Sequence, residues 1–175
     1  MENVQVDWLQ TSSTRIAVRL VLVLALFTVA CDSASTAPDL ERNDLTSMPT
    51  AQMTIGDHRF EVWEARTARE LTLGLMHVEA SELAPTQDGA IRGMLFVFDS
   101  EQPRRFWMKD TPTALDIAYL RTDGTIVKTH TMVPFDTSTY PSVEPAQFAL
   151  EVLAGTFADL GIVEGDRATI PSGPF

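Results

Sequence analysis

The chain has 175 residues, of which 45% are hydrophobic and 21% charged, values that are ordinary for a single globular domain. Its formal net charge of −11 argues against nucleic acid as a partner, because phosphate binding needs clustered Lys and Arg. Cys31 is the only cysteine, which excludes an internal disulfide, a zinc knuckle and a redox pair of cysteines.

The first thirty residues have the features of an export signal. An uninterrupted apolar run, 20–30, follows Arg15 and Arg19, and it is too short for a membrane-spanning helix, which takes about 20 residues. We therefore predict a signal peptide over residues 1–30 and export to the periplasm or cell envelope. Cys31 comes next, and the junction resembles a bacterial lipoprotein signal, although Thr28 stands where that pattern usually has Leu. Acylation of Cys31 would make the membrane a partner. An ordinary secretory signal or an uncleaved anchor helix is the alternative.

Residues 31–51 are rich in Ser, Thr, Ala, Pro and Asp and show no apolar periodicity, so we predict a flexible tether there. The domain is then expected over residues 52–171. Within it, Gly56-Asp57 is a turn signal, and Thr67 with Glu70 forms a capping-box pattern that predicts a short helix ending near Gly74. A second short helix is expected from Thr156 to Gly161. Alternating or continuous apolar runs predict strands at 60–64, 93–98, 104–109, 115–120, 125–133, 147–153 and 166–170.

Many short strands with two short helices predict a mainly β domain of the α+β kind. We expect a small, largely antiparallel barrel or sandwich in a single domain. A doubly wound parallel sheet is disfavoured, because the strands do not alternate with long helices.

From about Thr54 to Ile170 the chain resembles the domain-of-unknown-function 192 family. The segments that carry the resemblance are Gly74–Met76, Gly93–Phe98, Phe106–Thr111, Leu115–Ile117, Asp123-Gly124, Leu150-Glu151, Ala154-Gly155 and Gly165-Asp166. The resemblance implies a compact β-barrel-like domain, often behind an export signal, with no settled reaction, cofactor or ligand. The chain departs from the family pattern at His77-Val78, Asp110 and Ala114, where the family often has an aromatic-basic pair, Asn and Pro.

The densest group of polar and aromatic side chains gives the candidate ligand site. It comprises Trp107, Lys109, Asp110, Thr111 and Asp116. In an extended segment Trp107 and Lys109 share one face, opposite Phe106 and Met108. An aromatic ring beside a cation and carboxylates suits a small polar ligand such as a sugar. The structural alternative is that Trp107 covers an apolar patch, Lys109 pairs with an acid and Asp110 caps a turn.

Asp110, Asp116 and Glu151 are the catalytic candidates, since two carboxylates with different pKa values can act as acid and base. Asp116 and Glu151 each stand between apolar residues, so both are expected to point away from the core. Solvated strand faces, or carboxylates that accept backbone amides, are the alternative.

No metal site or cofactor is predicted. His58, His77 and His130 lack the spacing of metal ligands, and no nucleophile motif or phosphate loop is present. The methionines (Met53, Met76, Met94, Met108 and Met132) are expected to fill the core rather than to bind copper.

Three functions follow from these patterns. The first is a non-enzymatic binding or accessory module at the cell envelope, for a small polar or sugar-like ligand. The second is a hydrolase whose carboxylates converge in one cleft, and the third is a structural protein-interaction module with an exposed apolar patch. The protein partner of the third is not identifiable from the residues.

Overall fold

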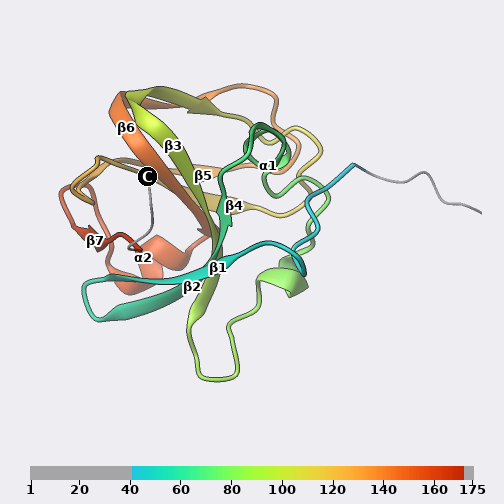
Figure 1. Cartoon of the computed structure of the whole chain (residues 1–175), viewed down its shortest axis with the longest axis horizontal. Helices are drawn as coiled ribbons and strands as arrows, with labels where there is room; N and C mark the ends of the chain where they lie inside the picture. The colour runs from blue at the N-terminus through green and yellow to red at the C-terminus, as the bar shows by residue number, and fades with distance from the viewer. Residues whose placement is uncertain (1–40, 172–175) are drawn as a thin grey trace, which may run out of the picture. The chain divides into compact units, whose positions relative to one another are not determined.

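The computed structural model describes residues 41–171 (Figure 1). The predicted signal peptide, Cys31 and the first part of the tether lie outside these residues. The strands are β1 Thr50–Ile55, β2 His58–Ala65, β3 Ile91–Phe106, β4 Leu115–Leu120, β5 Ile126–Met132, β6 Tyr140–Leu153 and β7 Ala168–Thr169. The helices are α1 Ala68–Leu73, the 3-10 turn η1 Ala80–Leu83 and α2 Thr156–Leu160.

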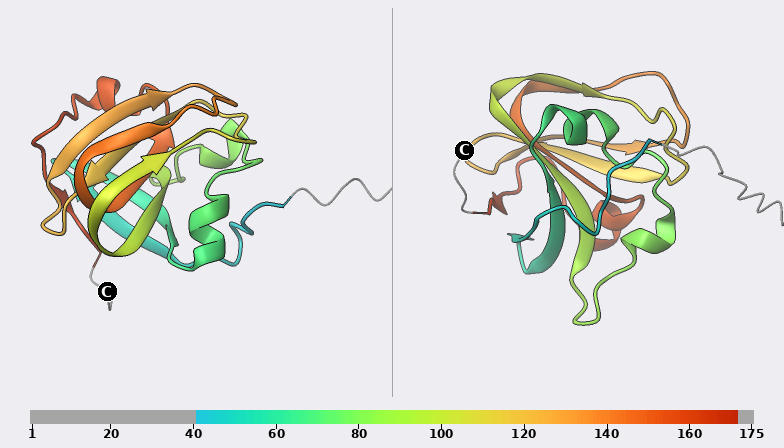
Figure 2. Two further views of the ribbon diagram at one scale, coloured as in Figure 1. Left: turned by 90° about the horizontal axis from the view of Figure 1, so that it is seen from above. Right: turned by 45° about the vertical axis from the view of Figure 1, so that its right-hand side comes forward.

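All seven strands belong to one sheet in the order β5-β4-β6-β3-β2-β1-β7. Every pair is antiparallel except β2 and β3. The sheet curls on itself, as Figure 2 shows. Its two edges approach each other where the amide of Ile126 donates to the carbonyl of Asp166 and that of Ala168 donates to Gly124. The predicted mainly β fold with short helices is therefore confirmed in the form of a curled half-barrel.

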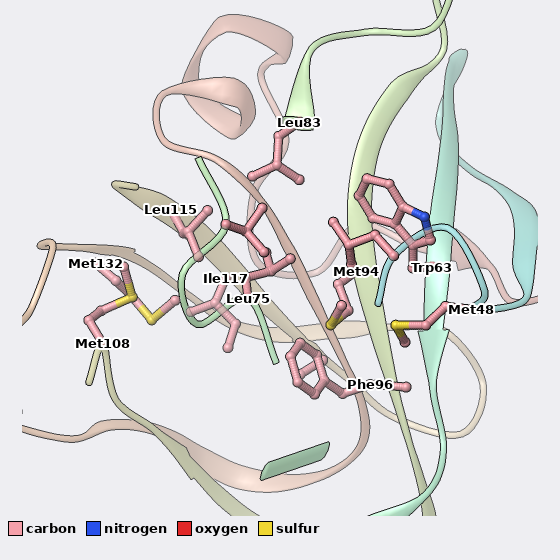
Figure 3. Close-up of a cluster of buried hydrophobic side chains, with 14 of the residues drawn as sticks. Met48, Trp63, Leu75, Leu83, Met94, Phe96, Met108, Leu115, Ile117 and Met132 are labelled. Carbon is pink, nitrogen blue, oxygen red and sulfur yellow. The ribbon is translucent and has the colours of Figure 1, made fainter. Parts of the chain in front are cut away.

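Two hydrophobic cores lie on the two faces of the sheet. We call one the α2 core, because Phe157 of α2 packs there with Phe60, Leu95 and Phe148. The other, the α1 core, is shown in part in Figure 3 and includes the buried residues Trp63, Leu75, Leu83, Met94, Phe96, Met108, Ile117 and Met132. Residues in and after α1 and η1, together with loops, cover this second face. β4 is buried on both faces as a result and has no exposed residue at all.

Several local predictions are confirmed. The Thr67 hydroxyl accepts from the amide of Glu70, and the Glu70 carboxylate accepts from the amide of Thr67, so the capping box begins α1. The helix ends at Gly74, whose φ of 47° favours glycine. Phe96 ring atoms would lie 3.1 Å from a Cβ at that position, so a side chain there would also be crowded.

The strand predicted at 93–98 and the one predicted at 104–109 are one element, since β3 runs through both. Its pairing with β6 shifts register between Val97 and Gln102 and again between Pro103 and Arg105. Pro103 faces Pro145 across this pair. Because proline has no amide hydrogen, the ladder is irregular there and the strand can bend.

Part of the predicted tether packs on the domain. Leu45 and Met48 are buried in the α1 core, and the Asn43 amide donates to the carbonyls of Glu70 and Gly74 at 3.0 Å. Residues 50 and 51 already belong to β1. Arg42 adds an ion pair with Glu82 and a hydrogen bond to the carbonyl of His77. The polar composition of this segment concealed these contacts, because most of the groups that anchor it are polar.

Candidate functional site

A cleft of about 370 Å³ opens between the end of α1 and the bent part of β3. Its polar lining residues are Thr72, Arg104, Arg105, Thr111 and Glu151, and its apolar ones are Leu71, Leu73, Leu75, Met76, Phe96, Phe98, Pro103, Phe106 and Trp107, with Gly74 between them. These residues come from α1, the turn that follows it, β3, the loop after β3, and β6. The curled sheet therefore gathers segments that are far apart in the chain around one opening.

Glu151 of β6 forms the floor of this cleft. It pairs with Met94 of β3 and Ile117 of β4, which both belong to the α1 core, so its side chain points to that face. The residue is only 4% exposed. Among residues 41–171 no hydrogen bond or ion pair reaches its carboxyl group. No fully buried side-chain oxygen in this part of the chain lacks a partner, so the Glu151 oxygens keep contact with the open cleft.

Burial raises the pKa of Glu151 to about 8. The carboxyl group is therefore mostly protonated at pH 7 and can both donate and accept a hydrogen bond. Its nearness also contributes to the raised pKa of the Tyr119 hydroxyl, although burial is the larger cause there. A neutral acid facing an opening is a hydrogen-bonding group for a polar ligand.

Aromatic rings build the walls. Phe106 packs edge-on against Phe96, with ring centroids 4.8 Å apart, and against Tyr119 at 5.7 Å. Phe98 lies 6.4 Å from Phe106. Trp107 follows at the rim and is 47% exposed. Its indole can therefore contact both the cleft and a molecule that enters from solvent.

Two arginines complete the rim. The Arg104 guanidinium lies 3.9 Å from the centroid of the Phe98 ring, and its Nε donates to the carbonyl of Ala146 at 3.2 Å. Burial lowers the pKa of Arg104. Arg105 is exposed. The cleft thus combines a neutral acid, aromatic faces and the Arg104 guanidinium.

The predicted ligand residues divide between this cleft and other places. Trp107 and Thr111 line it, and the expected alternation holds, since Met108 is buried while Trp107 and Lys109 are exposed. Lys109 and Asp110 lie outside the lining and form an exposed ion pair of 2.7 Å. That hydrogen bond with Lys109 is the main reason why the pKa of Asp110 is lowered.

Asp116 is not part of the cleft. It pairs with Val152, so it faces the α2 core on the opposite side of the sheet from Glu151. Its Oδ1 accepts from the Thr131 hydroxyl at 2.7 Å, and its Oδ2 accepts from the amide of Phe157 at 3.1 Å. Asp116 therefore caps the first turn of α2 from a neighbouring strand.

The expectation that Asp116 and Glu151 both point away from the core is wrong, since they are 2% and 4% exposed. Alternation along a strand determines only that consecutive side chains point to opposite faces of the sheet. Here both faces are covered by other elements, so a side chain can be buried on either face. The two carboxylates are not brought together, because the sheet lies between them. Glu151 is the only carboxylate of residues 41–171 in the lining of this cleft.

The loop that carries Trp107 is held by a backbone hydrogen bond between two residues with a left-handed backbone conformation. His77 and Asp110 have φ of 58° and 53°, and the amide of His77 donates to the carbonyl of Asp110 at 2.8 Å. Asp is among the residues that tolerate this conformation. Asp110 therefore shapes the turn beside the cleft through its backbone, while its side chain pairs with Lys109 instead of capping the turn.

Sequence reasoning did not identify Arg104 and Arg105 as site residues. Two adjacent cations after a proline in a strongly acidic chain were the available signal.

The methionines behave as core residues, with Met53 in the α2 core and Met94, Met108 and Met132 in the α1 core. Among residues 41–171 no group of His, Cys, Asp and Glu could hold a metal ion, and no helix there is long and apolar enough to cross a membrane.

The model of the family DUF192, described as Uncharacterized ACR, matches residues 51–170. The chain belongs to the DUF192 family.

Two solved structures are similar. One is a protein of unknown function from Novosphingobium aromaticivorans DSM 12444, with 28% identity and a TM-score of 0.63, over 74% of this chain and 91% of that one. The other, from Sinorhizobium meliloti 1021, is described as a putative transcription regulator and has 30% identity and a TM-score of 0.61, over 70% of this chain and 95% of that one. Comparison with curated proteins gave no significant match. The chain is thus an uncharacterised DUF192 domain.

Proposed function

We propose that this DUF192 domain is a non-enzymatic binding module whose cleft holds a small polar, sugar-like ligand. The observation that carries the proposal is Glu151, a cleft-lining residue that is only 4% exposed and whose carboxyl group has no hydrogen-bond or ion-pair partner among residues 41–171. Because these oxygens still reach the open cleft, a ligand hydroxyl that enters it could exchange hydrogen bonds with the protonated carboxyl group. Trp107 at the rim supplies a face on which a sugar ring stacks.

The arrangement favours binding over hydrolysis. Glycosidases of the common kind place two carboxyl groups about 5–10 Å apart on either side of the scissile bond. In this cleft Glu151 has no second carboxylate beside it in the lining, and Asp116 lies on the other face of the sheet. One neutral acid can orient a ligand, whereas acid–base hydrolysis of this type needs a partner.

The proposal is tested by calorimetric titration of the purified full chain with glucose and with N-acetylglucosamine, together with a thermal-shift screen of cell-wall fragments. We expect saturable binding that Trp107→Ala weakens at least about tenfold, the range that aromatic stacking contributes. Val163→Ala is the matched control, because Val163 is also exposed but does not line the cleft. If no sugar or fragment binds or stabilises the chain, the proposal is wrong.

We further propose that the module works outside the cytoplasm and is held at a membrane by an acylated Cys31. The support is the sequence alone: the apolar run 20–30 ends directly before the only cysteine. Fractionation of cells that express the chain tests this. Wild-type protein is expected with membranes and Cys31→Ser protein in the soluble fraction. Identical fractionation of the two would contradict the anchor.

A further inference from the structure

Two carboxyl groups are buried among residues 41–171, and their surroundings differ. Asp116 and Glu151 are 2% and 4% exposed. Asp116 has its hydrogen bonds within the protein, since it accepts from the Thr131 hydroxyl and from the Phe157 amide. Glu151 has no such partner among the described residues and lines the open cleft. Its hydrogen bonds are therefore made with a molecule that enters the cleft.

The other polar side chains of the lining are not directed at Glu151. The hydroxyls of Thr72 and Thr111 each donate to a backbone carbonyl. The Arg104 guanidinium donates to two backbone carbonyls and stacks on Phe98. Arg105 alternates with Arg104 along β3, so its side chain points to the opposite side of the strand. The cleft therefore presents the oxygens of one carboxyl group to a ligand, and no cation of residues 41–171 pairs with them.

Aromatic rings lie on both sides of this carboxyl group. Glu151 pairs with β3 and with β4, and Phe96 and Tyr119 of these two strands are its diagonal neighbours on the same face. The ring of Phe106 packs edge-on against both, with centroids 4.8 Å and 5.7 Å apart. Aromatic faces attract cations, and a carboxylate is their counter-ion. An acid among aromatic rings is thus suited to an ammonium group.

From this arrangement we infer that the ligand of the cleft is an amino sugar whose ammonium group binds to Glu151. This inference rests on the proposed function and narrows its ligand class. A hydroxyl offers one hydrogen to the carboxyl group, whereas an ammonium offers three hydrogens and a positive charge. The sugar ring would stack on Trp107 at the rim. The net charge of −11 adds a long-range attraction for a cation.

The titratable groups around Glu151 leave it free to act as the counter-ion. Burial and, to a smaller extent, Glu151 raise the pKa of Tyr119, so this hydroxyl stays neutral. Burial lowers the pKa of Arg104, and the carboxylate that opposes this effect is Asp99 rather than Glu151. Arg104 and Glu151 therefore do not act as an ion pair.

Binding of an ammonium group displaces a proton from the cleft. Glu151 is mostly protonated at pH 7, because burial raises its pKa to about 8. The ammonium group keeps its three hydrogens, the O–H bond of the carboxyl group breaks, and that proton passes to the solvent. A carboxylate beside an ammonium remains. Because the fold already excludes much of the water from this carboxyl group, the ion pair is stronger than one at the surface.

Calorimetry of the full chain at pH 7 and low salt tests the inference with glucose, N-acetylglucosamine and glucosamine. At one ring position these sugars carry a hydroxyl, an amide and an ammonium group. We expect glucosamine to bind at least about tenfold more tightly than the other two, because charge-assisted hydrogen bonds are roughly twice as strong as neutral ones. Titration in phosphate and in Tris, which differ in ionisation enthalpy, should show that glucosamine releases most of one proton and N-acetylglucosamine none.

The variant Glu151→Gln identifies the residue responsible. Glutamine keeps the size and the hydrogen-bonding capacity of the neutral acid but cannot ionise, so the preference for glucosamine and the proton release should both disappear. Glu164→Gln is the control, since Glu164 is an exposed carboxylate that pairs with Lys128 outside the cleft. It should leave the preference and the proton release unchanged.

The outcomes separate this inference from the proposed function. Equal binding of the three sugars, or binding of glucosamine to the wild type without proton release, overturns the inference and leaves the binding module standing. A preference for glucosamine that persists in Glu151→Gln also overturns it, because the amine would then be recognised elsewhere. Absence of binding for all three sugars overturns the inference, and the proposed function falls with it if the cell-wall fragments also fail to bind.

Discussion

The buried carboxyl group of Glu151 makes a specific contribution to the pH dependence of stability. Folding takes this group from a pKa of 4.5 to about 8, so the folded state holds its proton over a range in which the unfolded chain loses it. Stability from this group is therefore complete below pH 4.5 and is lost as the pH rises through about 8.

The size of the effect follows from the pKa difference. Each pH unit in this window removes about 1.4 kcal/mol, which gives about 4 kcal/mol between pH 5 and pH 9 as an upper value. Because the Glu151 oxygens still touch the open cleft, water can relieve part of the desolvation, and we expect about 2–4 kcal/mol. A glutamine at position 151 has no ionised form and should not lose this amount.

The assay is urea unfolding of the full chain and of Glu151→Gln at pH 5, 7 and 9, followed by circular dichroism. The free energy of unfolding of the wild type should fall relative to Glu151→Gln as the pH rises. Glu164→Gln is the control: a hydrogen bond from Lys128 lowers the pKa of Glu164, so it stays ionised throughout and its difference should stay flat. A difference between wild type and Glu151→Gln that is equally flat would refute the reasoning.

Three further predictions concern the frame around the cleft. Asp116→Ala should lower the free energy of unfolding by about 3 kcal/mol, because it leaves the amide of Phe157 and the hydroxyl of Thr131 without their acceptor, while any sugar affinity measured by calorimetry should not change. Gly93→Ala should cost at least about 2 kcal/mol in urea unfolding, since its Cβ would lie 2.4 Å from the carbonyl oxygen of Glu151; a wild-type midpoint would show that the two strands can separate there. Thr67→Ala should lower stability by about 1 kcal/mol in thermal unfolding through loss of the helix cap, and an unchanged melting temperature would contradict a role for that cap.

Interactions between residues that are close in the sequence determined most of the helices, strands and turns of this domain. The capping box of Thr67 and Glu70, the turn at Asp123-Gly124 and the strand Leu115–Leu120 all depend on contacts within a few residues, and each appears where it is predicted. The mainly β class follows from the same patterns. The family resemblance could also be read from the residues, because its motifs keep their order along the chain.

Only the tertiary structure decided which side chains share a site. Alternation shows that Asp116 and Glu151 differ in face from their apolar neighbours, but the pairing of β4 with β6 is what puts them on opposite sides of the sheet. The bend of β3, which depends on its register with β6, places Arg104 with the rings of Phe98 and Phe106 at the cleft. Register and burial on both faces are long-range properties, so no local pattern could assign the neutral acid on the floor of the cleft.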